Sequence, residues 1–122
     1  SEGHVLIDSG TETGADLVAA NIRFLGYRLE DIRFILHSHE HLDHVGGVAR
    51  LLQLTGATLV ASAPAARVFA TGVNGADDPQ AGQLKPFRAA PVGRIVGDGD
   101  VVRLRDIQLT ADGVREFGYA TD

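Results

Sequence analysis

Short apolar runs alternate with stretches that carry apolar residues at helical spacing along the first 70 residues. The runs at residues 4–7, 31–36 and 57–61 predict buried strands. Strands that alternate with helices indicate an α/β fold with a parallel sheet. Near-continuous apolar strands are expected in such a sheet because its crossover helices cover it.

Capping residues predict where the first helix begins and ends. Thr13, with Asp16 three residues later, is a candidate capping box, and Gly26 stands where a C-terminal cap is expected. The apolar face of this helix consists of Leu17, Val18, Ile22 and Leu25.

Two further helices are predicted after residue 44. The first covers residues 45–55 and ends at Gly56. The second begins at Ser62, carries Pro64 in its first turn and continues to about residue 70.

The C-terminal part of the chain has a different character. Residues 72–94 are rich in Gly, Pro, Ala and Asp without periodicity, which predicts a long loop. Residues 95–96, 101–104 and 107–110 predict short antiparallel strands, and the last stretch carries only weak signals. With neither a linker nor a repeat, the sequence predicts a single domain over residues 1–122.

The composition is that of a globular protein, and it argues against a membrane span, a nucleic-acid partner and any site that needs cysteine. Hydrophobic residues make up 44% of the chain, and no apolar run is long enough to span a membrane. The net charge of −5 argues against a nucleic-acid partner, which normally requires a basic face. The lack of cysteine excludes disulfides, cysteine–zinc sites and a cysteine nucleophile. No signal peptide is visible, and the lack of methionine indicates that the sequence does not begin at a natural start codon.

Four of the five histidines lie within eight residues, between His37 and His44. Residues 37, 39 and 41 alternate, so an extended backbone directs all three to one side. His39 and His41 would then supply two imidazole nitrogens to one metal ion, while Asp43 and His44 supply a second position nearby. The His-Glu-x-x-His helix motif is excluded, because Asp43 and not a histidine follows four residues after His39.

Structural roles stay open for the individual residues. A lone histidine is more often structural than a ligand, and Asp43 alone would be a good helix N-cap. His37 could simply end the strand, and His4 is expected to be structural. Imidazole and carboxylate sites also accept iron or manganese, so these residues do not fix the metal.

The segment His39-x-His41-x-Asp43-His44-Val-Gly-Gly resembles the zinc motif of the metallo-β-lactamase superfamily of hydrolases. Residues 5–10, Val-Leu-Ile-Asp-Ser-Gly, resemble the strand and aspartate that precede this motif in the family. The histidine at position 44 and the lack of cysteine argue against the β-lactamase subclasses that use a cysteine in the second zinc site. The sequence resembles the third subclass of zinc β-lactamases most. That resemblance covers most of residues 5–111 and includes 20–26, 30–33, 54–57 and 78–80.

The resemblance implies a fold, a cofactor and a reaction. The fold would be the N-terminal part of an αββα sandwich, incomplete in these 122 residues. One zinc would lie on His39 and His41 and a second on Asp43 and His44, while Asp8 would orient the ligands or act as a plain turn residue. A metal-bound hydroxide, with Asp43 as the catalytic residue, would open the ring of a β-lactam antibiotic.

The same resemblance implies that residues 72–94 form part of the substrate-facing wall. It also implies a periplasmic or secreted location and a role in antibiotic resistance.

The chain departs from the family pattern after about residue 111, where the family continues into a histidine-bearing loop and this sequence has no further histidine. Each implied zinc therefore has two motif ligands, whereas a catalytic zinc normally has three protein ligands. Half a sandwich would also expose an apolar sheet face, which predicts self-association or a complementing chain. The alternatives are another hydrolase of the superfamily, acting on a thioester or lactone, and a non-catalytic truncated remnant.

Overall fold

The computed structural model describes residues 3–37, 46–73, 86–97, 99–104, 107–112 and 116–121. No helix in these ranges is long and apolar enough to cross a membrane. The helical elements are α1 (Ala15–Phe24), the 3₁₀ turn η1 (Leu29–Asp31), α3 (Val48–Thr55) and α4 (Ala63–Thr71). The strands are β1 (His4–Ile7), β2 (Ile32–Leu36), β3 (Thr58–Ser62), β4 (Arg94–Val96), β5 (Val101–Leu104), β6 (Ile107–Asp112) and β7 (Glu116–Thr121).

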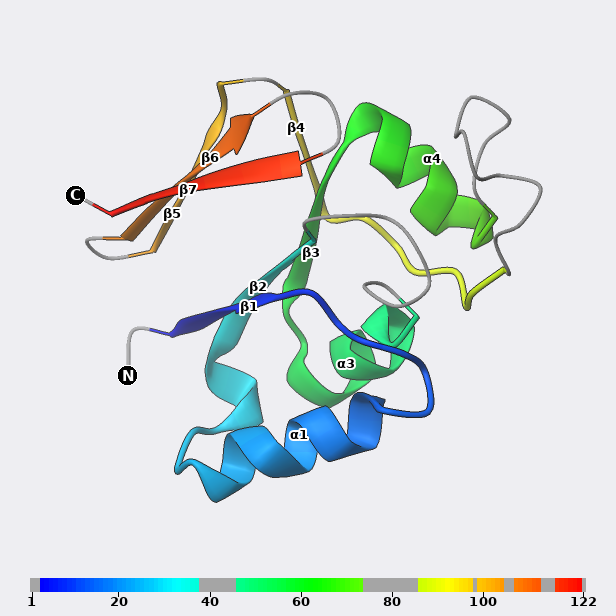
Figure 1. The fold of residues 1–122 in the computed structure, drawn as a ribbon, viewed down its shortest axis with the longest axis vertical. Coiled ribbons are helices and arrows are strands. Elements are labelled where there is room, and N and C mark those ends of the chain that lie inside the picture. The colour runs from blue at the N-terminus through cyan, green and yellow to red at the C-terminus, as the bar shows by residue number, and fades with distance from the viewer. Residues whose placement is uncertain are drawn as a thin grey trace.

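The first sheet has the order β1-β2-β3-β4, and all of its neighbouring strands are parallel (Figure 1). Parallel neighbours need crossover connections, which α1, α3 and α4 supply in turn. In the register of the first pair, Ile7 lies opposite Leu36, so β1 and β2 end side by side at the same edge. The predicted α/β fold with a parallel sheet is confirmed.

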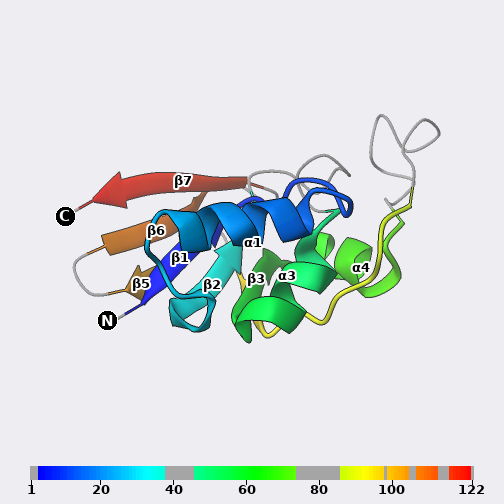
Figure 2. The same cartoon turned by 90° about the horizontal axis from the view of Figure 1, so that it is seen from below.

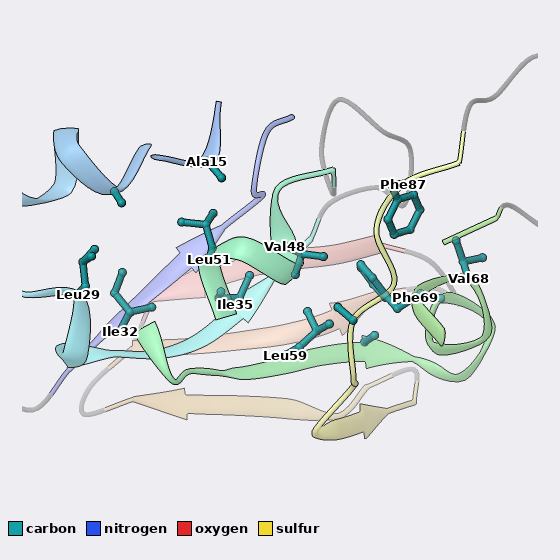
Figure 3. Packing of buried hydrophobic residues seen from close by; sticks show 14 residues of the cluster. Ala15, Leu29, Ile32, Ile35, Val48, Leu51, Leu59, Val68, Phe69 and Phe87 are labelled. Carbon is teal, nitrogen blue, oxygen red and sulfur yellow. The ribbon is translucent and has the colours of Figure 1, made fainter. Parts of the chain in front are cut away.

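The larger hydrophobic core lies between this sheet and its helices. Figure 2 shows α1 and α3 side by side along the sheet, where the two helices contact each other. Ile35 and Leu59 extend from the strands into a cluster with Val48 and Leu51 of α3, as Figure 3 shows. Burial of this apolar surface is what fixes the helices on the sheet.

The second sheet, with the order β5-β6-β7, is antiparallel and contributes to a smaller core on the other face of the parallel sheet. Leu36, Val60 and Val96 of the parallel sheet are buried there in one cluster with Val102 and Leu109. The parallel sheet is therefore covered at these positions on the face opposite to the larger core. Self-association or a complementing chain stays a prediction.

The predicted capping box at the start of α1 is wrong. Gly14 is the N-cap residue, without a side-chain capping hydrogen bond. Its backbone N donates to Thr11 Oγ1 at 3.2 Å, so Thr11 rather than Thr13 accepts the hydrogen bond from this backbone N. Asp16 instead pairs with Arg50 of α3, with 2.9 Å between Oδ1 and Nε.

The apolar face of α1 also differs from the prediction. Leu17 and Leu25 are 64% and 69% exposed, whereas Ala15 and Ala19 are buried. Val18 and Ile22 pack against the core as predicted, so the buried face combines these two residues with the alanines, while Leu17 and Leu25 lie toward the solvent. Periodicity identified the helix but assigned part of its buried face wrongly.

The ends of the next two helices follow the prediction more closely. Gly56 ends α3 in a left-handed conformation. Ser62 caps α4, where its Oγ accepts a hydrogen bond from Ala65 N at 3.3 Å, and Pro64 lies in the first turn. The helix predicted over residues 45–55 begins later than predicted, at Val48, because Gly47 is its N-cap residue.

Two features of the C-terminal strands were predicted wrongly or missed. β4 pairs with β3 in parallel rather than joining an antiparallel set, because α4 and the segment that follows it return the chain in the same direction. β7 was not predicted, because Glu116–Thr121 lacks a clear apolar alternation. The antiparallel pairing of β5 with β6 is confirmed.

Gly72 ends α4 against the backbone of Phe87. It has a φ of +76°, and a Cβ at this position would overlap the carbonyl oxygen of Phe87. Phe87 N donates a hydrogen bond to Gly72 O at 2.8 Å. The contact between Gly72 and Phe87 therefore joins the end of α4 to the chain that leads into β4.

Replacing Gly72 by alanine is expected to destabilise the protein more than the same change at Gly56. Both glycines end a helix at positive φ, but a Cβ at Gly56 would meet nothing within 4 Å. The left-handed backbone costs alanine about 1–2 kcal/mol at either position, and overlap with Phe87 adds about 1–3 kcal/mol. Urea unfolding of Gly72→Ala and Gly56→Ala measures the difference, and equal losses would contradict the close approach.

Candidate metal site

The four predicted metal ligands, His39, His41, Asp43 and His44, lie outside the described residues. The structure describes the chain up to His37 and again from Gly46. The structure gives the geometry of the residues before and after the predicted ligands. The assignment of the ligands themselves stays a prediction.

A buried hydrogen bond lies just before the segment that carries the predicted metal ligands. His37 follows β2 directly and is 5% exposed, and its Nε2 lies 2.6 Å from Oγ of Ser9. Ser9 is 1% exposed and belongs to the turn after β1. The parallel pairing of β1 with β2 brings the two residues together, because both follow strand ends at the same sheet edge.

The same turn also contacts the chain where the ligand segment ends. Gly47 N donates a hydrogen bond to Gly10 O at 3.1 Å. A Cβ at Gly47 would lie 2.6 Å from Ser9 O and 2.8 Å from Thr11 O, which is closer than real Cβ atoms approach. The predicted close backbone packing at Gly46-Gly47 is thus confirmed for Gly47.

Asp8 lies in this turn with an uncommon backbone conformation. Its φ is +64°, and its backbone N donates to Leu36 O at 2.7 Å. Non-glycine residues with positive φ are uncommon, although aspartate tolerates this region better than most residues. Its role in orienting metal ligands stays a prediction, while its place beside the end of β2 is shown.

Aromatic contacts extend from His37 toward the predicted substrate wall. The ring of His37 lies 5.2 Å from that of Phe69. Phe69 lies 5.9 Å from Phe87 in an edge-to-face arrangement, and Figure 3 shows these two phenylalanines. Phe87 follows the segment 74–85, which is outside the described residues. His37, just before the predicted ligands, and Phe87, within the predicted substrate wall of residues 72–94, therefore both contact the buried ring of Phe69.

The part of the chain that the structure describes contains no group of three or more histidine, cysteine, aspartate or glutamate side chains that could hold a metal. The donors in residues 39–44 are imidazoles and a carboxylate, which suit zinc. His4, predicted to be structural, packs its ring against Tyr27 at 4.8 Å.

Sequence reasoning missed the pairing of Ser9 with His37. His37 was interpreted as the end of a strand, although a serine and a histidine that directly follow two parallel neighbouring strands could have indicated contact. No local pattern links residues 28 positions apart, so the pair depends on the strand order.

Comparison with known proteins gives one family. A sequence profile of the metallo-beta-lactamase superfamily matches residues 1–121. A 50-residue match at 38% identity to ribonuclease J of Mycobacterium tuberculosis covers 41% of this chain and 9% of that protein.

Two solved structures are similar over nearly the whole chain. The MIM-2 metallo-beta-lactamase is 49% identical with a TM-score of 0.87, and the match covers 96% of this chain and 46% of that one. MEM-A1, a subclass B3 metallo-beta-lactamase from a soil metagenome library, is 42% identical with a TM-score of 0.84 and corresponding coverage of 97% and 46%. The chain thus spans a little under half the length of these two proteins.

Alanine at Gly47 is expected to destabilise the protein more than alanine at Gly14. Both glycines are helix N-caps with a φ close to −90°, so the loss of a favourable cap residue costs each variant about 1 kcal/mol. At Gly14 the nearest contact is the Thr11 hydroxyl, which can rotate away, whereas Gly47 meets backbone oxygens. Crowding should therefore cost Gly47→Ala an additional ~1–3 kcal/mol.

Denaturant unfolding of the two metal-free variants, Gly47→Ala and Gly14→Ala, checks this comparison. If Gly14→Ala loses as much stability as Gly47→Ala, the turn after β1 does not pack tightly on the start of α3.

Proposed function

The chain belongs to the metallo-β-lactamase superfamily, and on that premise we propose that it is part of a zinc-dependent hydrolase that opens the β-lactam ring. The observation that carries the proposal is the position of the His39-x-His41-x-Asp43-His44 segment. It directly follows β2, in a fold whose solved neighbours include MIM-2 and a subclass B3 enzyme. The third-subclass resemblance of the sequence is confirmed by these neighbours.

The ligand residues would hold up to two zinc ions. His39 and His41 would bind one, and Asp43 and His44 would bind the other, since imidazole and carboxylate donors suit this metal. Zinc supplies Lewis acidity and lowers the pKa of a bound water to about 7. Asp43 is the proposed catalytic residue, because an ionised carboxylate there can orient the attacking water. Asp8, which is bonded to the end of β2 through its backbone, would orient the ligands.

Full activity would require more ligands than this sequence supplies. A catalytic zinc normally has three protein ligands, and the sequence has no histidine after His44. A non-catalytic remnant that binds metal weakly is therefore the alternative from another class of function. A hydrolase acting on a thioester or lactone is the alternative within the superfamily.

Substrate and location belong to the same proposal. The partner would be a small β-lactam rather than nucleic acid, because the net charge of −5 disfavours a polyanion. A periplasmic or secreted location, and a role in antibiotic resistance, rest on the family resemblance alone.

Removing the two ligands of the first metal position should lower the zinc content. The double variant His39→Ala/His41→Ala is expected to lose the zinc of that position, because the position then keeps no imidazole. His4→Ala is the matched control, since His4 packs on Tyr27 and lies outside the motif. Atomic absorption after equilibrium dialysis measures the zinc bound per chain in the double variant and in His4→Ala. Unchanged zinc in the double variant would place the metal elsewhere.

Zinc-loaded protein should hydrolyse a carbapenem in preference to other substrates. We expect slow carbapenem turnover, with none of a thioester, a lactone or an RNA oligonucleotide, because the family neighbours named above are β-lactamases. Absorbance assays on one zinc-loaded preparation measure all rates. Near-stoichiometric zinc without carbapenem turnover would contradict hydrolase activity for these 122 residues and favour the remnant.

A further inference from the structure

We propose that the Ser9–His37 pair is a positioning device for the metal-ligand segment, and that it raises the zinc affinity of that segment. The inference rests on the proposed zinc function. In it, His37 is not a ligand. Its buried side chain fixes the point from which the chain continues to His39, two residues later.

The geometry of the pair supports a positioning role rather than direct chemistry. A serine hydroxyl 2.6 Å from an imidazole nitrogen also occurs where a base activates a nucleophile. Here the serine is 1% and the histidine 5% exposed, so no substrate can reach the hydroxyl. The hydrogen bond therefore acts within the protein.

His37 is fixed from more than one direction. Its Nε2 bonds to Ser9, and its ring packs on Phe69 of α4 at 5.2 Å between centroids. Ser9 itself cannot shift freely, because its carbonyl oxygen lies against Gly47 at the start of α3. The turn after β1 thus contacts the chain on both sides of the predicted ligands, at His37 before them and at Gly47 after them.

Stability alone does not explain a polar pair at this place. A net buried hydrogen bond contributes only about 1 kcal/mol, and a leucine at position 37 could fill the space between Ile35 and Phe69 without polar desolvation. What the pair adds is a fixed orientation. Metal–ligand distances tolerate only about 0.2 Å of error, so the orientation of the chain just before His39 matters for affinity.

Four variants separate positioning from general stability. Ser9→Ala removes the hydroxyl, and His37→Leu removes the imidazole while keeping an apolar side chain. His37→Gln keeps a polar group near the position of Nε2. Thr55→Val is the matched control, because it removes another buried hydroxyl, which donates to Leu51 O at 2.7 Å at the far end of α3.

Two measurements are made on each variant and on the unmodified chain. Competition with a chromophoric chelator gives the zinc affinity. Amide hydrogen exchange of peptides covering residues 38–47, without metal, gives the effect on the ligand segment itself.

We expect Ser9→Ala and His37→Leu to lower zinc affinity about tenfold, in the range found for groups that orient metal ligands. The same two variants should speed amide exchange in residues 38–47. His37→Gln should restore most of both properties, and Thr55→Val should change neither, although it loses comparable stability.

Two results would overturn the inference: exchange in residues 38–47 that is unchanged in Ser9→Ala, or a change of equal size in Thr55→Val. If the unmodified chain binds no zinc, the proposed zinc function fails and the claim about affinity fails with it. The exchange comparison then still decides whether the pair positions the segment.

Discussion

Hydrogen bonds between the parallel strands β1 and β2 bring Ile7 opposite Leu36, and the candidate site depends on that register. Asp8 continues the pairing, since its backbone N donates to Leu36 O at 2.7 Å. Both strands therefore end at one sheet edge, where the turn after β1 meets the residue that begins the histidine segment. An antiparallel β2 would have directed that segment to the opposite edge.

The turn after β1 is held by the core beneath it. Asp8 takes a backbone conformation that costs about 1–3 kcal/mol and persists only where surrounding structure determines it. Ala15 at the start of α1 and Val48 at the start of α3 are fully buried in one core cluster, which fixes the two helices beside each other. Gly47 then allows the backbone of α3 to lie against Ser9 without a side chain between them. The packing of two helices thus sets the geometry of a polar turn.

Much of this fold was predictable, because strands and helix ends are encoded locally. His4–Ile7 was predicted with its observed bounds, and the Ser62 cap was predicted from residue type and position. Contacts between distant residues were not predictable in this way. Leu17 is exposed because α1 packs on α3 through alanines, and the Ser9–His37 bond depends on the strand order. The spacing of the histidine cluster and the family resemblance together supplied the ligand assignment, which lies outside the described residues and stays a prediction.

If the turn after β1 holds residues 39–44 in place to bind zinc, crystals grown with zinc should show the metal at these residues. Diffraction recorded at energies on both sides of the zinc absorption edge locates the ion. We expect an anomalous peak within about 2.0–2.2 Å of an imidazole nitrogen of both His39 and His41, with Ser9 still hydrogen-bonded to His37. A peak at His4 or at surface carboxylates, with none beside His39, would contradict it.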